Sequence, residues 1–218
     1  METSIFDCIE DNKLDNVKLL ISAGVNVNVV NTIGKTPLFL ALLKGKTEIA
    51  KLLVEHGADV NSENDGKSIL YLAAKYGNLE IVKTLIEHGA CIDHCGDHKT
   101  PVFETALGTA SENGKIEIVK LLLEHGADVN RTNVFNDSAL FLAASRGHIN
   151  VVKLLIGHGA DIHAASIRGQ GIVRGRYNSC HTALSAAYYN NYAEICKLLV
   201  DKGARFDITT TDGLLGHF

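Results

Sequence analysis

The stretch TPLFLALLKGKTEIAKLLVEHGADVN, residues 36–61, contains two short apolar segments, each followed by a glycine. Thr36 is suited to cap a helix, because its hydroxyl can accept from backbone N–H groups of the first turn. Pro37 follows at the first helical position, where its missing N–H group costs nothing. Gly45 and Gly57 are typical of helix ends at which the backbone adopts a positive φ. The stretch therefore predicts a helix, a tight turn and a second helix.

The same pattern occurs six times, this stretch included, along the chain of 218 residues. The glycine after the second helix recurs at spacings of 33, 32, 37, 33 and 44 residues, at Gly24, Gly57, Gly89, Gly126, Gly159 and Gly203. A Thr or Ser lies 21 residues before each of them, at Thr3, Thr36, Ser68, Thr105, Ser138 and Thr182. Because this interval is constant, both insertions lie between a glycine and the next Thr or Ser. Thr105, and not Thr100, therefore keeps the register in the fourth copy.

The second helix of each unit is amphipathic, with Ile118, Leu121 and Leu122 on one face in the fourth copy. Asn12 and Asn191 replace the turn glycine in the first and last copies, and asparagine is the next most tolerant residue for positive φ. One helix pair cannot bury both of its apolar faces. Stacked neighbours can, and the repeat therefore predicts an elongated array with a continuous core.

This pattern resembles the ankyrin repeat family over essentially the whole chain, most clearly at residues 36–61 and at SALFLAASRGHINVVKLLIGHGADIH, residues 138–163. The resemblance implies an all-α solenoid of stacked helix-turn-helix units joined by β-turn or finger loops. One departure concerns the histidine of the family's T-P-L-H motif, which is replaced by Phe6, Phe39, Tyr71, Gly108, Phe141 and Ser185. Packing is expected to replace the hydrogen bonds of that histidine.

We predict one domain, residues 1–218, with repeats at approximately 1–34, 35–66, 67–103, 104–136, 137–180 and 181–213 and a tail at 214–218. An enlarged loop at 91–104 and an insertion at 165–179 account for the two long intervals. The polar surface of repeat one suits an N-terminal cap. At the other end two alternatives stay open: a modest C-terminal cap, or a chain cut from a longer protein.

Composition narrows the functional classes. The net charge of −4 disfavours binding to DNA, RNA or acidic lipid, and no apolar run approaches the roughly 20 residues of a membrane helix. The first residues lack the pattern of a signal peptide. Five irregularly spaced cysteines argue against a disulfide framework and for a reducing compartment. We expect a cytoplasmic or otherwise intracellular monomer without a cofactor or membrane partner, in which Cys8 and Cys196 are small core residues.

The insertion contains GQGIVRG, residues 169–175, which superficially resembles a phosphate-binding loop. Its spacing is G-x-G-x-x-x-G, no apolar strand precedes it, and the next helix begins only at Thr182, so nucleotide binding is disfavoured. Two alternatives stay open: flexible connecting chain, or a recognition loop for an acidic or phosphorylated peptide. In the second alternative, Arg168, Arg174 and Arg176 would bind the peptide, because guanidinium groups pair with carboxylates and phosphates.

The enlarged loop holds a cluster of zinc-type ligands: Cys91, His94, Cys95 and His98. Their spacing matches no finger motif, and an enlarged polar loop is the favoured interpretation. The histidines of the HGA endings, His56, His88, His125 and His158, recur with the period and are therefore assigned to the structural unit. The chain contains no catalytic motif such as G-x-S-x-G or H-E-x-x-H, and we predict no enzyme activity.

The family resemblance implies a concave surface, built from the finger loops and the first helices, that binds a protein partner. Aromatic residues and arginine are enriched at binding hot spots. The predicted contact residues are Ile33, Lys35, Lys44, Lys67, Tyr76, Val134, Phe135, Arg146, Tyr189 and Asn190, with Arg168, Arg174 and Arg176. Solubility explains the lysines equally well. The resemblance also implies that Asn61 and Asn130 can be hydroxylated.

The predicted function is protein–protein interaction, as a scaffold, adaptor or inhibitor. The alternative is a targeting module that was cut from, or acts with, a larger catalytic or ubiquitin-ligase-type adaptor protein.

Overall fold

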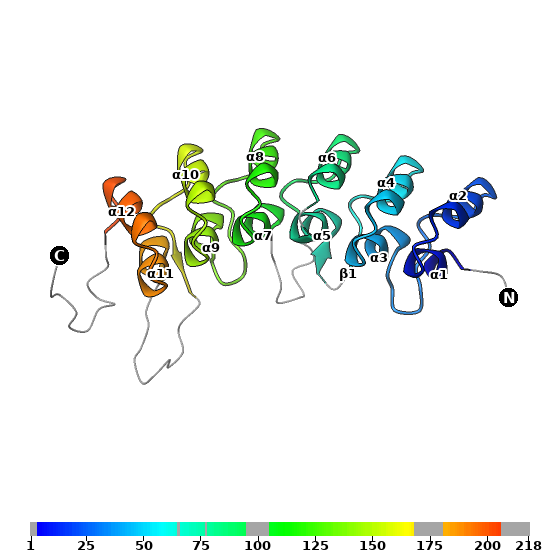
Figure 1. Cartoon of the computed structure of the whole chain (residues 1–218), viewed down its shortest axis with the longest axis horizontal. Helices are drawn as coiled ribbons and strands as arrows, with labels where there is room; N and C mark the ends of the chain where they lie inside the picture. Colours follow the sequence, from blue (N-terminus) through cyan, green and yellow to red (C-terminus); the bar gives the residue numbers. More distant parts are fainter. Residues whose placement is uncertain (1–3, 65, 77, 95–104, 168–180, 206–218) are drawn as a thin grey trace.

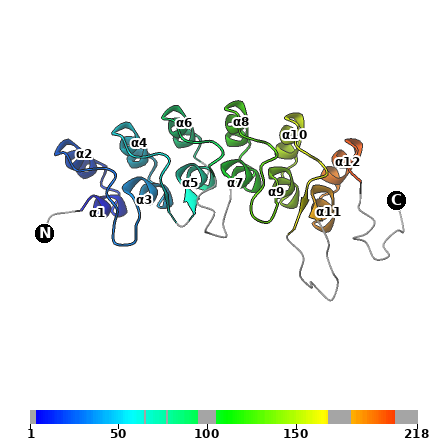
Figure 2. The same cartoon turned by 180° about the vertical axis from the view of Figure 1, so that it is seen from behind.

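The computed structural model describes residues 4–64, 66–76, 78–94, 105–167 and 181–205. Its helices form two rows that run side by side along an elongated array. The rows arch, so that the row containing α1 and α11 lies on the concave side and the row containing α2 and α12 lies on the convex side (Figure 1). The view from behind shows the same pairing of one inner and one outer helix in each repeat (Figure 2). The structure therefore has the all-α solenoid architecture that the repeat predicts.

Within these described ranges, each repeat contributes two helices. The inner helices are α1 (Ile5–Glu10), α3 (Pro37–Leu43), α5 (Ile69–Tyr76), α7 (Ala106–Glu112), α9 (Ala139–Ser145) and α11 (Ala183–Tyr189). The outer helices are α2 (Leu14–Ser22), α4 (Thr47–Glu55), α6 (Leu79–Glu87), α8 (Ile116–Glu124), α10 (Ile149–Gly157) and α12 (Ala193–Asp201). Neighbouring helices pack against each other within each row as well as within each repeat.

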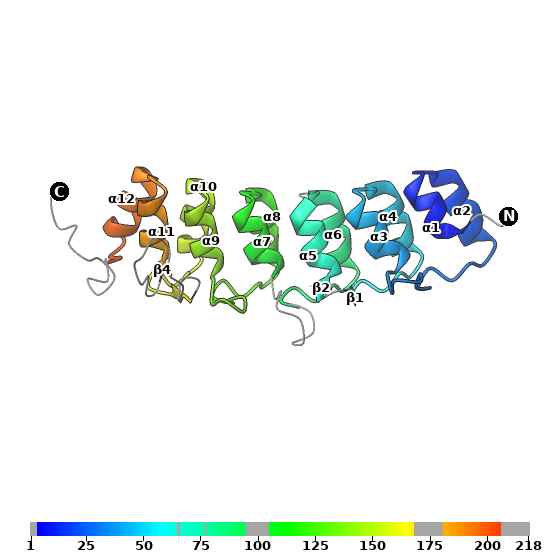
Figure 3. The same cartoon turned by 90° about the horizontal axis from the view of Figure 1, so that it is seen from below.

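Two of the finger loops between repeats carry short antiparallel strand pairs. In the first, β1 (Glu63–Asn64) pairs with β2 (Lys67–Ser68). In the second, β3 (Ala165–Ser166) pairs with β4 (His181–Thr182). The strands and finger loops lie along one edge of the array, on the same side of every helix pair (Figure 3).

The second strand pair corrects the predicted limits of the insertion. Ala165 and Ser166 were assigned to it, but they form β3 and belong to the finger itself. Because β3 pairs with β4, the extra residues connect the two strands of one finger, and neither neighbouring helix is interrupted.

Helix capping follows the sequence register in five repeats. Thr36, Ser68, Thr105, Ser138 and Thr182 each accept a hydrogen bond, through the side-chain oxygen, from a backbone N–H three residues later. The assignment of the fourth cap to Thr105 is therefore confirmed, and Thr100 lies outside the described residues.

The first repeat departs from this register by one residue. Its helix is capped by Ser4, whose side chain accepts from the backbone N–H of Phe6 and whose own backbone N–H donates to Asp7. The predicted cap, Thr3, lies outside the described residues. The turn positions agree with prediction: Asn12 and Asn191 adopt φ of 57° and 62°, in the region that glycine occupies in the internal repeats.

Most of the core is one continuous cluster that runs from Ile5 to Ala204, and Phe141, Leu142 and Ala186 form a second, small cluster. The central feature of the large cluster is a row of leucines, one on each outer helix from repeat two onward, which are all fully inaccessible to solvent: Leu53, Leu85, Leu122, Leu155 and Leu199. On the inner helices Phe39, Tyr71 and Phe141 are buried, which confirms that packing occupies the T-P-L-H histidine position in these three repeats.

Asparagines at the end of the outer-helix segments tie neighbouring repeats together. Asn28, Asn61 and Asn130 each donate through Nδ2 to a glycine carbonyl of the next repeat, over 3.0 to 3.2 Å. The Oδ1 atom of each accepts a backbone N–H two residues beyond that glycine, over 2.7 to 2.8 Å. Asp93 takes this position in repeat three and accepts from the N–H of Asp128.

Replacing Leu122 by Ala should lower the free energy of unfolding by about 3 kcal/mol, because the side chain is wholly buried and leaves a cavity. Urea denaturation followed by circular dichroism measures the change. The matched control is Leu19→Ala on the outer helix α2, where the leucine is 68% exposed and the expected change is below about 0.5 kcal/mol. Equal losses in both variants would contradict the leucine row as the centre of the core.

Replacing Asn130 by Ala should cost about 1 kcal/mol of stability, because the substitution removes two hydrogen bonds between repeats four and five. Asn150→Ala is the control: this side chain is exposed and makes no hydrogen bond within the described residues. Thermal unfolding of both variants provides the comparison. An unchanged midpoint for Asn130→Ala would show that the asparagine bridge does not stabilise the stack.

Candidate functional site

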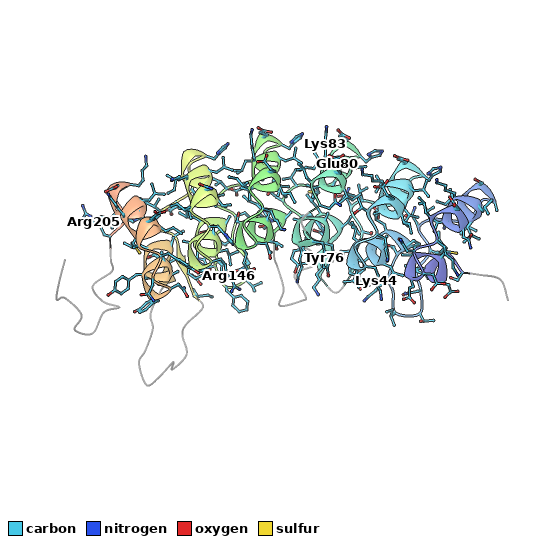
Figure 4. The ribbon with its side chains drawn as sticks, in the orientation of Figure 1. Lys44, Tyr76, Glu80, Lys83, Arg146 and Arg205 are labelled. Atoms are coloured by element: carbon cyan, nitrogen blue, oxygen red, sulfur yellow. The ribbon has the colours of Figure 1, made fainter. Side chains whose placement is uncertain are left out.

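The predicted contact residues that the structure describes lie on one surface, formed by the finger loops and the C-terminal ends of the inner helices. We call it the finger surface; it comprises Ile33, Lys35, Lys44, Lys67, Tyr76, Val134, Phe135, Arg146, Tyr189 and Asn190. Lys44, Tyr76 and Arg146 lie along the concave side of the array, whereas Glu80 and Lys83 lie on the opposite side (Figure 4). The structure therefore places Lys44, Tyr76 and Arg146 on the same side of the array, while the contact role of the whole set stays a prediction.

Two fingers share a rigid loop geometry. In the finger after repeat one, Asn31 Oδ1 accepts from the backbone N–H groups of Ile33 and Lys35, at 3.1 and 2.9 Å. Gly34 follows Ile33 and adopts the left-handed backbone conformation, with φ of 74°. The side chain of Ile33 is 65% exposed. The asparagine thus holds an apolar residue at the tip of the loop.

The finger after repeat four repeats this geometry at the same register. Asn133 Oδ1 accepts from the N–H groups of Phe135 and Asp137, both at 2.9 Å, and Asn136 takes the left-handed position with φ of 57°. Val134 and Phe135 are 38% and 42% exposed. Two fingers therefore present apolar side chains on loops that are fixed by the same asparagine motif.

The tip after repeat four is also joined to the next finger. The carbonyl of Phe135 accepts from the N–H of Ile167 over 2.8 Å, and the hydroxyl of Ser166 bonds to the buried carboxylate of Asp137. Ile167 is 50% exposed and extends the apolar tip formed by Val134 and Phe135. Sequence reasoning missed Ile167, because the residue was assigned to the insertion.

Arg146, one of the predicted contact residues, already has a carboxylate partner within the protein: its Nη2 and Nε atoms lie 2.6 and 3.2 Å from Glu112 Oε1. The pair joins the inner helices of repeats four and five. A partner's carboxylate would therefore have to compete with Glu112.

The inner helix of repeat six ends in an aromatic pair. The rings of Tyr188 and Tyr189 meet edge to face with centroids 5.9 Å apart, and Tyr189 is 52% exposed. The amide of Asn190 donates to the carbonyl of Ala186 over 2.8 Å. The amide nitrogen of Asn190 thus serves the end of its own helix, which makes this residue a weaker contact candidate than Tyr189.

The other proposed sites are only partly described. Arg168, Arg174 and Arg176, as well as Cys95 and His98, lie outside the described residues. His94 Nε2 lies 3.0 Å from Glu63 Oε2, while Cys91 is exposed. The part of the chain that is described contains no group of three or more residues that could hold a metal ion.

The HGA histidines have the structural role that their periodicity predicts. Nδ1 of His56, His88, His125 and His158 lies 2.8 to 2.9 Å from the carbonyl oxygen four residues earlier, at the end of an outer helix. The amides of Asn61 and Asn130 are engaged in the bridges between repeats, and their hydroxylation stays a prediction. No helix in the described ranges is long and apolar enough to cross a membrane.

A hollow of about 770 Å³ on the outward face of the last described repeat was not predicted. Its lining includes Tyr188, Tyr192, Cys196 and Val200.

The two cysteines that were expected in the core differ in burial. Cys8 is a fully buried core residue, as expected, but Cys196 is only partly buried, and this partial burial raises the pKa of its thiol. The positions that correspond to Cys196 in the other repeats hold Val17, Ala50, Val82, Val119 and Val152, which are all inaccessible to solvent. The hollow thus marks the face at which stacking ends within the described chain.

Comparison with known proteins agrees with the architecture. A family model of three ankyrin repeats matches residues 5–96 and 94–166, and a model of the single ankyrin repeat matches residues 180–211. An ankyrin repeat-containing protein of Saccharomyces cerevisiae is 53% identical over 45 residues, which is 21% of this chain and 9% of that protein.

Two longer proteins also match. The inactive serine/threonine-protein kinase TEX14 of Bos taurus is 34% identical over 61 residues, or 28% of this chain and 4% of its own length. The E3 ubiquitin-protein ligase KEG of Arabidopsis thaliana is 33% identical over 63 residues, or 29% and 4%. The matched segments thus cover less than a tenth of each of these three relatives. The family models, in contrast, match most of this chain, in the register of the repeats described above, and the chain therefore belongs to the ankyrin repeat family.

Proposed function

We propose that the protein is a non-catalytic interaction module that binds a protein partner through the finger surface. Ankyrin repeats are generally protein-interaction modules, and their domains are typically non-catalytic. The observation that carries the proposal is the shared geometry of two fingers, in which an asparagine fixes the loop while Ile33 or Phe135 stays exposed.

This geometry suits binding for an energetic reason. An apolar side chain on a mobile loop can turn away from water or bury itself locally, and ordering it on binding costs conformational entropy. The loops that present Ile33 and Phe135 are already held by two hydrogen bonds each, so that less entropy is lost. Burying a large apolar side chain in a partner contributes roughly 1.5–3 kcal/mol. Exposed anchors on fixed loops are therefore better suited to recognition than to stability.

The charge of the chain favours a protein over a nucleic acid as the partner. The net charge is −4, and nucleic-acid binding draws its affinity largely from many cations against phosphates. The finger surface combines isolated lysines with apolar and aromatic tips, a composition that resembles protein interfaces.

The double variant Ile33→Ala, Phe135→Ala tests this role. We expect it to lose most of the proteins that the wild-type chain captures from cells, because each substitution removes an exposed anchor without opening a cavity. Leu19→Ala removes an equally exposed aliphatic side chain from an outer helix and should leave capture unchanged. Quantitative mass spectrometry of the captured proteins measures the difference, and identical sets from all three chains would exclude the finger surface as the binding site.

A second candidate role is substrate recognition for a catalytic protein. Its support is that similar segments occur within a much longer ubiquitin ligase and a much longer inactive kinase. In this role the captured protein would be modified or degraded as a result of binding. We expect its half-life to change when the protein is absent, and to be restored by wild-type chain but not by Ile33→Ala, Phe135→Ala. An unchanged half-life in cells lacking the protein would favour a scaffold or inhibitor instead.

A further inference from the structure

The finger surface includes three lysines of repeats two and three, and we call them the basic face: Lys35, Lys44 and Lys67. Lys35 and Lys67 lie in adjacent fingers, which are joined by a hydrogen bond from Asn64 Nδ2 to the carbonyl of Gly34, over 2.9 Å. Lys67 pairs with Asn64 in the strand register, and Lys35 directly follows Gly34. Lys44 follows the other end of α3, the helix that Lys35 precedes.

The lysines of the basic face have no carboxylate partner among the described residues. Lysines on the outer helices of repeats two to four differ: Lys51, Lys83 and Lys120 lie 3.7 to 4.0 Å from Glu80, Glu87 and Glu124, respectively. Ion pairs thus join lysines to carboxylates on the convex side, whereas no described carboxylate pairs with the basic face; Glu63, in the same finger as Lys67, contacts His94 instead. The charged ends of these lysines are therefore available to a ligand, on a protein with a net charge of −4.

The positive charge is confined to two repeats. Lys44 occupies the position just before the turn glycine, and the equivalent residue of repeat one is Asp11, which pairs with Lys13 at 2.7 Å. In repeats four and five, Glu112 and Arg146 neutralise each other. A ligand that is recognised by charge would therefore cover repeats two and three and little else.

Apolar groups lie beside these lysines. Ile33 is 65% exposed, two residues before Lys35 on the same fixed loop, and Tyr76 is 46% exposed at the position equivalent to Lys44 in the next repeat. Lys35 itself lies over the ring of Phe39, with its Nζ atom 5.6 Å from the centroid. This contact restricts the lysine while its charged end remains available.

From this arrangement we propose that the basic face binds a short, carboxylate-rich segment of the partner protein, with apolar side chains of that segment packing against Ile33 and against Tyr76. The inference rests on the proposed function and specifies the chemistry of the partner. Packed helices lie about 8–10 Å apart, a distance that about three residues of an extended chain span. The segment would therefore carry Asp or Glu at every third position.

A synthetic probe tests the proposal without knowledge of the partner. The probe is a fluorescent peptide of about twelve residues with Glu at every third position and Leu between them, and its control replaces every Glu by Gln. Fluorescence polarisation measures binding to the full chain. We expect the Glu peptide to bind and the Gln peptide not to bind, with an affinity that falls as ionic strength rises from about 50 to about 500 mM.

Matched variants locate the site. Lys44→Glu, Lys67→Glu should weaken binding of the Glu peptide at least about tenfold, because two attractive charges become repulsive. The variant Lys83→Glu, Lys120→Glu makes the same change in net charge on the convex side. It should alter the affinity less than about twofold, because salt ions screen these distant charges from the peptide. Tyr76→Ala should weaken binding but leave the dependence of the affinity on salt concentration unchanged, since it removes an apolar contact and no charge.

Several outcomes would overturn the inference: equal binding of the Glu and Gln peptides, equal weakening by the two charge-reversed variants, or tighter binding of a single-stranded oligonucleotide that displaces the peptide. None of these three outcomes would decide whether the finger surface binds a protein, so the proposed function is tested separately. Loss of cellular partners in Ile33→Ala, Phe135→Ala together with full retention in Lys44→Glu, Lys67→Glu would refute the acidic segment and keep the interaction module.

Discussion

The structure depends on burial between repeats, since no single helix pair can cover its own apolar surface. The leucine row shows this most directly. Leu53, Leu85, Leu122 and Leu155 are wholly inaccessible between their neighbours, whereas Leu20, the equivalent residue of repeat one, is only partly buried. At the other end of the described array Leu199 stays inaccessible, but the hollow lined by Cys196 lies at a position that is closed in the internal repeats. Stability is therefore shared between neighbours and weakest at the ends.

The fold could be predicted from the sequence because each structural requirement recurs locally, once in every repeat. A cap needs a hydroxyl, a tight turn needs glycine or asparagine, and both appear at a constant interval. This constancy was sufficient to choose Thr105 over Thr100 in a repeat that contains both. The register was wrong only for the first cap, where Ser4 takes the place of Thr3. Ser4 is also followed three residues later by Asp7, which completes a capping box, a local signal that outweighs the period.

The candidate site was less predictable, because its details depend on contacts between residues far apart in the sequence. Arg146 could be recognised as a contact candidate, but its pairing with Glu112, thirty-four residues away, depends on how two inner helices align. Ile167 was hidden in an apparent insertion until the pairing of β3 with β4 placed it in a finger. The recurrence of the asparagine motif at Asn31 and Asn133 could have been found from sequence, since both lie two residues before the exposed apolar tip.

The separation between constant and variable positions explains how one scaffold can carry a specific surface. Positions that face the neighbouring repeat hold mostly apolar residues, because closely packed helices leave little room for hydrated polar side chains. The position before the turn glycine or asparagine faces the concave side and is free of this restriction: it holds Asp11, Lys44, Tyr76, Asn113, Arg146 and Asn190. The regular stacking of the inner helices converts these independent choices into an ordered row of side chains, one for each repeat. The members of the row then differ in whether they are neutralised within the protein, as Arg146 is by Glu112, or have no carboxylate partner among the described residues, as is the case for Lys44.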